Sequence, residues 1–176
     1  MPAVSRSSRP AAPRLRRPRS ARSACGDSSK APVGPAVILI DTTPLVALCD
    51  ARDSKHRTAL KHLESLAADA FAVCDAVLTE ACFHLPHRSQ RQRLRAMLHD
   101  LSMQPLPVTH ERAFWLEVLD WLAKYADHEP DWADACLAVL SGRDRDLKVW
   151  TYDREFRTTW RRPNGTAIPL AVRSTQ

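Results

Sequence analysis

VILIDTTPLVALC, at residues 37–49, joins an unbroken apolar run to an acid and then to a second, mostly apolar segment. Four apolar residues followed by a polar break are typical of a buried strand, and Asp41 stands where that strand ends. Pro44 suits the first turn of a helix, so we expect a helix from Pro44 to Cys49. The segment therefore predicts a strand and a helix that meet at a single acid.

Similar apolar runs alternate with helical patterns along the rest of the chain. Asp75 is expected to cap one helix, and Ser89 and Gln92 have the spacing of a capping box at the start of another. We expect strands at residues 37–41, 71–74, 106–108 and 147–151 and an edge strand at 167–170, with helices at 44–49, 54–68, 75–85, 89–99, 110–125 and 130–142. This alternation predicts an α/β layer with a parallel or mostly parallel sheet.

Three more acids lie in apolar surroundings. Asp153 follows the apolar run at 147–152, whereas Glu80 and Asp134 lie inside helical segments rich in Ala, Val, Leu and Cys. Taken singly, each has a structural alternative: a cap or turn for Asp41 and Asp153, a solvent-facing side chain for Glu80, and a first-turn acid favoured by the helix dipole for Asp134.

Their joint placement favours a metal site. In a parallel sheet the carboxyl ends of the strands meet at one edge, where ligands collect. Desolvated carboxylates need a cation to offset their charge, and Mg²⁺ takes oxygen ligands. We therefore expect Asp41, Glu80, Asp134 and Asp153 to form one divalent-cation site.

Four segments together resemble the acidic motifs of PIN domains. They are IDTTPLVAL at 40–48, LTEAC at 78–82, WADACL at 132–137 and WTYDREF at 150–156. The resemblance spans about residues 36–170 and is greatest to the VapC-type toxins of bacterial toxin–antitoxin pairs. It implies a three-layer α/β/α fold around a mostly parallel sheet of about four or five strands.

The resemblance also implies an activity. PIN toxins of this type are cytoplasmic endoribonucleases that depend on Mg²⁺ or Mn²⁺, frequently form homodimers and are inhibited by a small cognate antitoxin. Carried over by position, Asp41, Glu80, Asp134 and Asp153 would be both the catalytic residues and the metal ligands. Thr151 would be a hydroxyl partner of the site, and Asp131, one helical turn before Asp134, would support it indirectly.

The charge is distributed unevenly along the 176 residues. Residues 1–35 carry eight Lys or Arg and one acid, whereas residues 36–176 carry 18 Lys or Arg and 19 acids. We expect 1–35 to be a disordered basic tail, rich in Arg, Ser, Pro and Ala, and 36–176 to be the nuclease domain. The tail reads as an arm that contacts phosphates, as a transit-like leader, or as an upstream extension without a role.

The five cysteines suggest reduced, buried thiols in a cytosolic protein, because their number is odd and no CxxC occurs. Cys82, His84 and His87 lack the second Cys/His pair that a zinc site would need.

Basic residues suggest how an anionic substrate would be held. The sequence has two arginine clusters, and each either contacts phosphates or is a solvated helix face. The first cluster is Arg88, Arg91, Arg93 and Arg95, and the second is Arg154, Arg157, Arg161 and Arg162. Trp160 could stack on a base or lie in the core.

Other functions also fit parts of the sequence. A haloacid-dehalogenase-type phosphatase would need an acid at Thr43. A PIN nuclease of RNA processing and a non-catalytic nucleic-acid-binding module remain alternatives.

Overall fold

A four-stranded parallel sheet organises the domain. The computed structural model describes residues 36–106, 111–144 and 146–172. The predicted basic tail, and Val108 and His110 of the predicted elements, lie outside these residues. The strands are β1 (Val37–Ile40), β2 (Ala70–Val73), β3 (Gln104–Pro105) and β4 (Leu147–Trp150), in the order β3-β2-β1-β4.

The central strand β1 has parallel neighbours on both sides, with Ile38 opposite Phe71 of β2 and Lys148 of β4. Its residues 38–40 are fully buried, which explains the unbroken apolar run.

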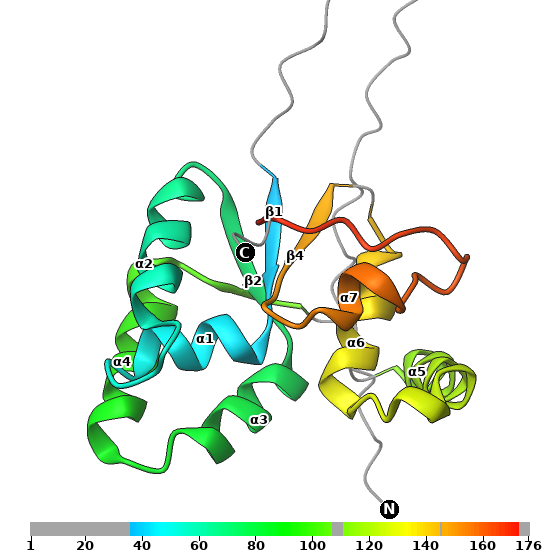
Figure 1. The fold of residues 1–176 in the computed structure, drawn as a ribbon, viewed down its shortest axis with the longest axis horizontal. Helices are drawn as coiled ribbons and strands as arrows, with labels where there is room; N and C mark the ends of the chain where they lie inside the picture. Colours follow the sequence, from blue (N-terminus) through cyan, green and yellow to red (C-terminus); the bar gives the residue numbers. More distant parts are fainter. Residues whose placement is uncertain (1–35, 107–110, 145, 173–176) are drawn as a thin grey trace, which may run out of the picture. The chain divides into compact units, whose positions relative to one another are not determined.

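Helices cover both faces of the sheet (Figure 1). The helices in chain order are α1 (Thr42–Cys49), α2 (His56–Ser65), α3 (Asp75–His84), α4 (Arg88–Asp100), α5 (Arg112–Lys124), the 3-10 helix η2 (Ala126–His128), α6 (Trp132–Ser141) and α7 (Glu155–Thr158). In this view α1, α2 and α4 lie on one side of the strands and α5, α6 and α7 on the other. The predicted α/β class and parallel sheet are therefore confirmed.

Helix α6 is buried nearly all round, from Ala135 to Ser141, as its apolar sequence predicts. The first turn of α6 and the whole of α3 meet below the strand ends, and α3 packs against α6. The carboxyl ends of β1 and β4 therefore face the junction of these two helices. No helix of the described residues is long and apolar enough to cross a membrane.

Two predicted helix caps are wrong, at the starts of α4 and α3. The predicted capping box of Ser89 and Gln92 is wrong: α4 begins one residue earlier, and the Gln90 side chain accepts a hydrogen bond from the His87 N–H at 3.0 Å. Asp75 is not the cap of α3 but its first residue, and Cys74 occupies the cap position.

The expected edge strand at 167–170 is reduced to isolated bridges. Leu170 pairs with Val149 of β4, and Ala167 pairs with Arg161. Pro169 accepts a hydrogen bond from the Val149 N–H at 2.8 Å but has no N–H of its own to extend a ladder.

Two side-chain predictions can also be settled. Trp160 is 2% exposed, so it belongs to the core. Cys49, Cys74 and Cys136 are buried thiols as expected, but Cys82 is exposed because it lies on the outer face of α3.

Candidate functional site

Asp41 joins the end of β1 to the start of α1. Its Oδ1 accepts a hydrogen bond from the Thr42 N–H at 2.6 Å, so it is a helix cap. Its Oδ2 accepts from the hydroxyls of Thr43 at 2.8 Å and Thr151 at 2.7 Å. Burial nonetheless raises the pKa of Asp41 to about 6, and the charge of Glu80 adds to the increase, against the lowering effect of these hydrogen bonds. The residue is thus both a cap and a poorly solvated anion.

Glu80 reaches the same place from α3. Its Oε2 accepts a hydrogen bond from the Thr42 hydroxyl at 2.7 Å, and its Oε1 lies 3.6 Å from His84 Nε2 one turn along the helix. Thr42 therefore contacts two of the predicted ligands, Asp41 through its amide and Glu80 through its hydroxyl. Glu80 therefore faces the site, although its side chain is still 31% exposed.

Asp134 lies in the first turn of α6. It exchanges hydrogen bonds with Asp131: the Asp134 N–H donates to Asp131 Oδ1 at 2.8 Å, and the Asp131 N–H donates to Asp134 Oδ2 at 3.2 Å. Burial, and after it the charges of Asp131, Asp41 and Asp153, raise the pKa of Asp134 to about 8. Asp134 is therefore close enough to three other acids for their charges to raise its pKa.

Asp153 follows β4 and has a turn role as well. Its N–H donates to the Thr151 hydroxyl at 2.9 Å, and its Oδ1 accepts from the Glu155 N–H at 2.8 Å, at the start of α7. Its charge acts on Asp134 across the strand ends. The structure therefore brings all four predicted acids to one edge of the sheet.

The hydroxyls of Thr42 and Thr43 are functional groups that the sequence reasoning missed. Both hold predicted ligands, and Thr43 also accepts a hydrogen bond from the Tyr152 N–H at 3.2 Å. The sequence signal that could have indicated them is the pair of threonines directly after Asp41, the acid that ends the strand. Asp131, which was expected to support the site indirectly, is the N-cap of α6, and its side chain accepts a hydrogen bond from the Asp134 N–H.

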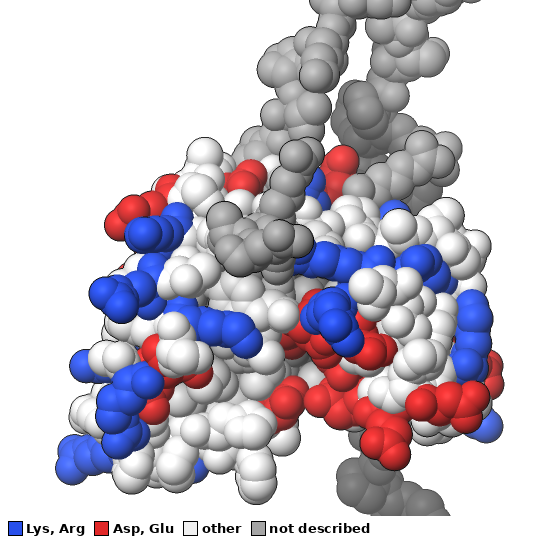
Figure 2. Space-filling view, in the orientation of Figure 1, with Lys and Arg blue, Asp and Glu red and all other residues white. Residues whose placement is uncertain are grey.

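The donor set fits a hard divalent cation. Within residues 36–106, 111–144 and 146–172, no three His, Cys, Asp or Glu side chains are already gathered around one point. Glu80 and Asp134 are held by Thr42 and Asp131 instead. The carboxylates nevertheless offer only oxygen ligands, and burial and neighbouring acids raise the pKa of two of them. Figure 2 shows acidic side chains gathered between the strand ends and α6, with basic ones over α7.

The comparisons with known proteins agree with this architecture. The model of the PIN domain family matches residues 38–160. No curated protein matches significantly. Among solved structures, the chain resembles VapC20 of Mycobacterium tuberculosis, described as a toxin that cleaves the sarcin–ricin loop. That match has 23% sequence identity and a TM-score of 0.55, and it covers 66% of this chain and 89% of VapC20. The three-layer α/β/α arrangement is confirmed, and the chain belongs to the PIN domain family.

Proposed function

We propose that the chain is a metal-dependent endoribonuclease and the toxin of a toxin–antitoxin pair. The observation that carries the proposal is the meeting of acids at the strand ends: Thr42 contacts Asp41 and Glu80, and the Thr151 hydroxyl contacts Asp41 and the Asp153 N–H. Membership of the PIN family and the likeness to VapC20 support the same activity.

Asp41, Glu80 and Asp134 would hold one or two Mg²⁺ or Mn²⁺ ions, directly or through water, and Asp153 would support a second ion or orient the attacking water. Such ions, when bound, supply an activated water and neutralise the phosphate and the leaving oxygen. The protein's own contribution is positioning. Thr43 and Thr151 orient Oδ2 of Asp41, and Asp131 fixes the backbone from which Asp134 projects.

The proposal includes two protein partners, a small cognate antitoxin and a second copy of the chain. Helix α5 supports the second, because it exposes Leu116 and Leu119 on its outer face. Exposed apolar side chains at helical spacing suit a contact between proteins.

Cleavage by wild type and by Asp41→Asn protein tests the proposed function. The substitution removes the charge and keeps the shape, so the fold should persist while cleavage of single-stranded RNA in Mg²⁺ falls by orders of magnitude. A chelator should stop the wild type as well. Induced expression in a bacterial host should arrest growth with the wild type only. If folded D41N protein cuts RNA at the wild-type rate, the assignment is wrong.

A further inference from the structure

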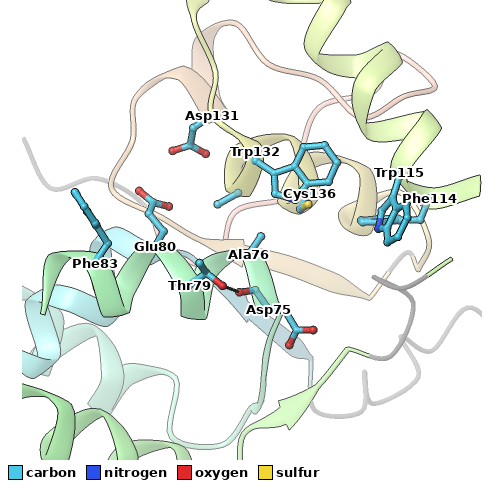
Figure 3. Close-up of a pocket in the computed structure, with 11 residues that line it drawn as sticks. Asp75, Ala76, Thr79, Glu80, Phe83, Phe114, Trp115, Asp131, Trp132 and Cys136 are labelled. Atoms are coloured by element: carbon cyan, nitrogen blue, oxygen red, sulfur yellow. Dashed lines mark hydrogen bonds between the residues drawn. The ribbon is translucent and has the colours of Figure 1, made fainter. Parts of the chain in front are cut away.

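An apolar groove of about 590 Å³ runs between α3, α5 and the first turn of α6 (Figure 3). Aromatic side chains line much of it, and several are exposed: Phe83 by 81%, Trp115 by 46% and Trp132 by 40%. Side chains of this size are usually buried, and an exposed group of them indicates a binding surface.

The groove is continuous with the carboxylate site. Glu80 and Asp131 form part of its lining and face each other in Figure 3, so one end of the groove opens onto the acids. Glu80 also lines a second, smaller hollow of about 210 Å³, whose lining includes Lys55 and His84 but also Asp53. The groove therefore adjoins, through Glu80, the proposed metal site.

The groove, beside the proposed metal site, suits the base of a nucleotide whose phosphate lies at that site. A nucleobase is flat and uncharged and stacks on aromatic rings, whereas a phosphate is anionic and favours a cation. The acids at the mouth of the groove would repel a phosphate, but they can accept hydrogen bonds from the amino groups on a base edge.

Resting on the ribonuclease function proposed above, we propose that this groove is a nucleobase subsite, which holds one unstacked base of single-stranded RNA beside the bond to be cut. Phe83 and Trp132 are its stacking surfaces. A base inside a duplex has its faces covered, so the substrate is a loop or a single strand. An apolar groove alone would also suit a protein segment, but its continuity with the proposed metal site through Glu80 favours a nucleotide.

Binding of abasic RNA tests the subsite. The probes are fluorescein-labelled single-stranded oligoribonucleotides of equal length and charge, either intact or with one abasic residue moved along the chain. Anisotropy is measured on Asp41→Asn protein, so that the RNA stays uncut. An abasic residue at one position should weaken binding roughly 5- to 100-fold, the range expected for one stacked base.

Variants locate the effect. Phe83→Ala removes an almost fully exposed ring and should leave the fold unchanged, and it should bind intact and abasic RNA with nearly equal affinity. Trp132→Leu should do the same, whereas Trp132→Phe, which keeps a ring, should retain most of the difference. Leu60→Ala changes an apolar residue of α2 that is 41% exposed and is not part of the groove lining, and it should behave like the parent protein.

Two results would overturn the subsite. The parent protein could bind intact and abasic RNA equally, which would assign the groove to a protein segment instead, or the penalty could persist unchanged in F83A and W132L. If the proposed ribonuclease function is wrong, the result differs, because the wild-type protein would then cut none of the oligonucleotides. Failure of the subsite alone leaves wild type cutting intact and abasic RNA alike.

Discussion

The hydroxyl of Thr151 donates a 2.7 Å hydrogen bond to Oδ2 of Asp41 from 110 positions further along the chain. The same hydroxyl accepts a hydrogen bond from the Asp153 N–H at 2.9 Å. Thr151 is itself 1% exposed, so neither bond can be replaced by bulk water. One side chain therefore fixes the ends of β1 and β4 and orients an acid on each.

Thr151→Val should destabilise the protein by about 1–3 kcal/mol, because the buried carboxylate and the Asp153 amide each lose a partner while the side-chain volume hardly changes. It should also lower the rate of RNA cleavage, since Asp41 is no longer oriented and its pKa rises further. Urea denaturation and initial rates check the two effects. Thr151→Ser, which restores the hydroxyl, should recover most of both, and equal losses in the Val and Ser variants would refute the role of the hydrogen bond.

The stability of the metal-free protein should decrease as the pH rises from about 4 to about 8. The pKa values of Asp41, about 6, and Asp134, about 8, both lie above the ordinary 3.8. The folded state therefore binds these protons more tightly than the unfolded chain, and ionisation opposes folding within this window. Denaturant titrations in chelator at several pH values measure the slope. Asp134→Asn should flatten it, and an increase of wild-type stability relative to D134N with rising pH would contradict the assignment.

Mg²⁺ or Mn²⁺ should stabilise the folded chain. An ion that binds only the folded state at a concentration 100 times its Kd adds about 2.7 kcal/mol, which corresponds to a Tm increase of several degrees. Thermal melts with increasing metal test this without any substrate. Asp134→Asn should lose the shift, while Asp120→Asn, which changes an exposed acid of α5 outside the site, should keep it. If neither metal changes the Tm of the wild-type protein, the proposed metal site is wrong.

The two arginine clusters should differ in their effect on RNA binding. In the second cluster, Arg161 donates to the carbonyls of Trp160 and Thr158, so part of its charge serves the fold, whereas Arg154 is exposed directly beside Asp153. Arg154→Gln should weaken binding severalfold and reduce the salt dependence by about one phosphate contact. Arg95→Gln is the matched control, on α4, which contributes no acid to the site. Equal losses in the two variants would mean that the charge acts non-specifically.

The parts of the fold that sequence could predict are those with a strong periodic pattern. The apolar run 37–40 favoured a buried strand, and the placement of Asp41 at its end followed from that. The same reasoning placed Asp153 after β4. The two alternatives weighed for Asp41, cap or ligand, do not exclude each other, because Oδ1 caps α1 while Oδ2 is directed to the threonines.

Other features depend on contacts that a linear pattern does not encode. Nothing near Thr42 in sequence indicates that its hydroxyl meets Glu80, since that contact needs α3 to pack against α1. Ser89 and Gln92 satisfied the spacing of a capping box as well as His87 and Gln90 did, and only the geometry of the preceding turn decides between them. The aromatic groove could not be predicted from the sequence for the same reason, because Phe83, Trp115 and Trp132 come from three helices.

The strand order has a consequence during protein synthesis. The strand β4, which lies beside β1, is the last of the four to leave the ribosome. A nascent chain that already contains the first three acids still lacks the strand that delivers Thr151 and Asp153. The four acids can therefore share one edge only after β4 has been synthesised, and a nuclease of the proposed kind would be inactive until then.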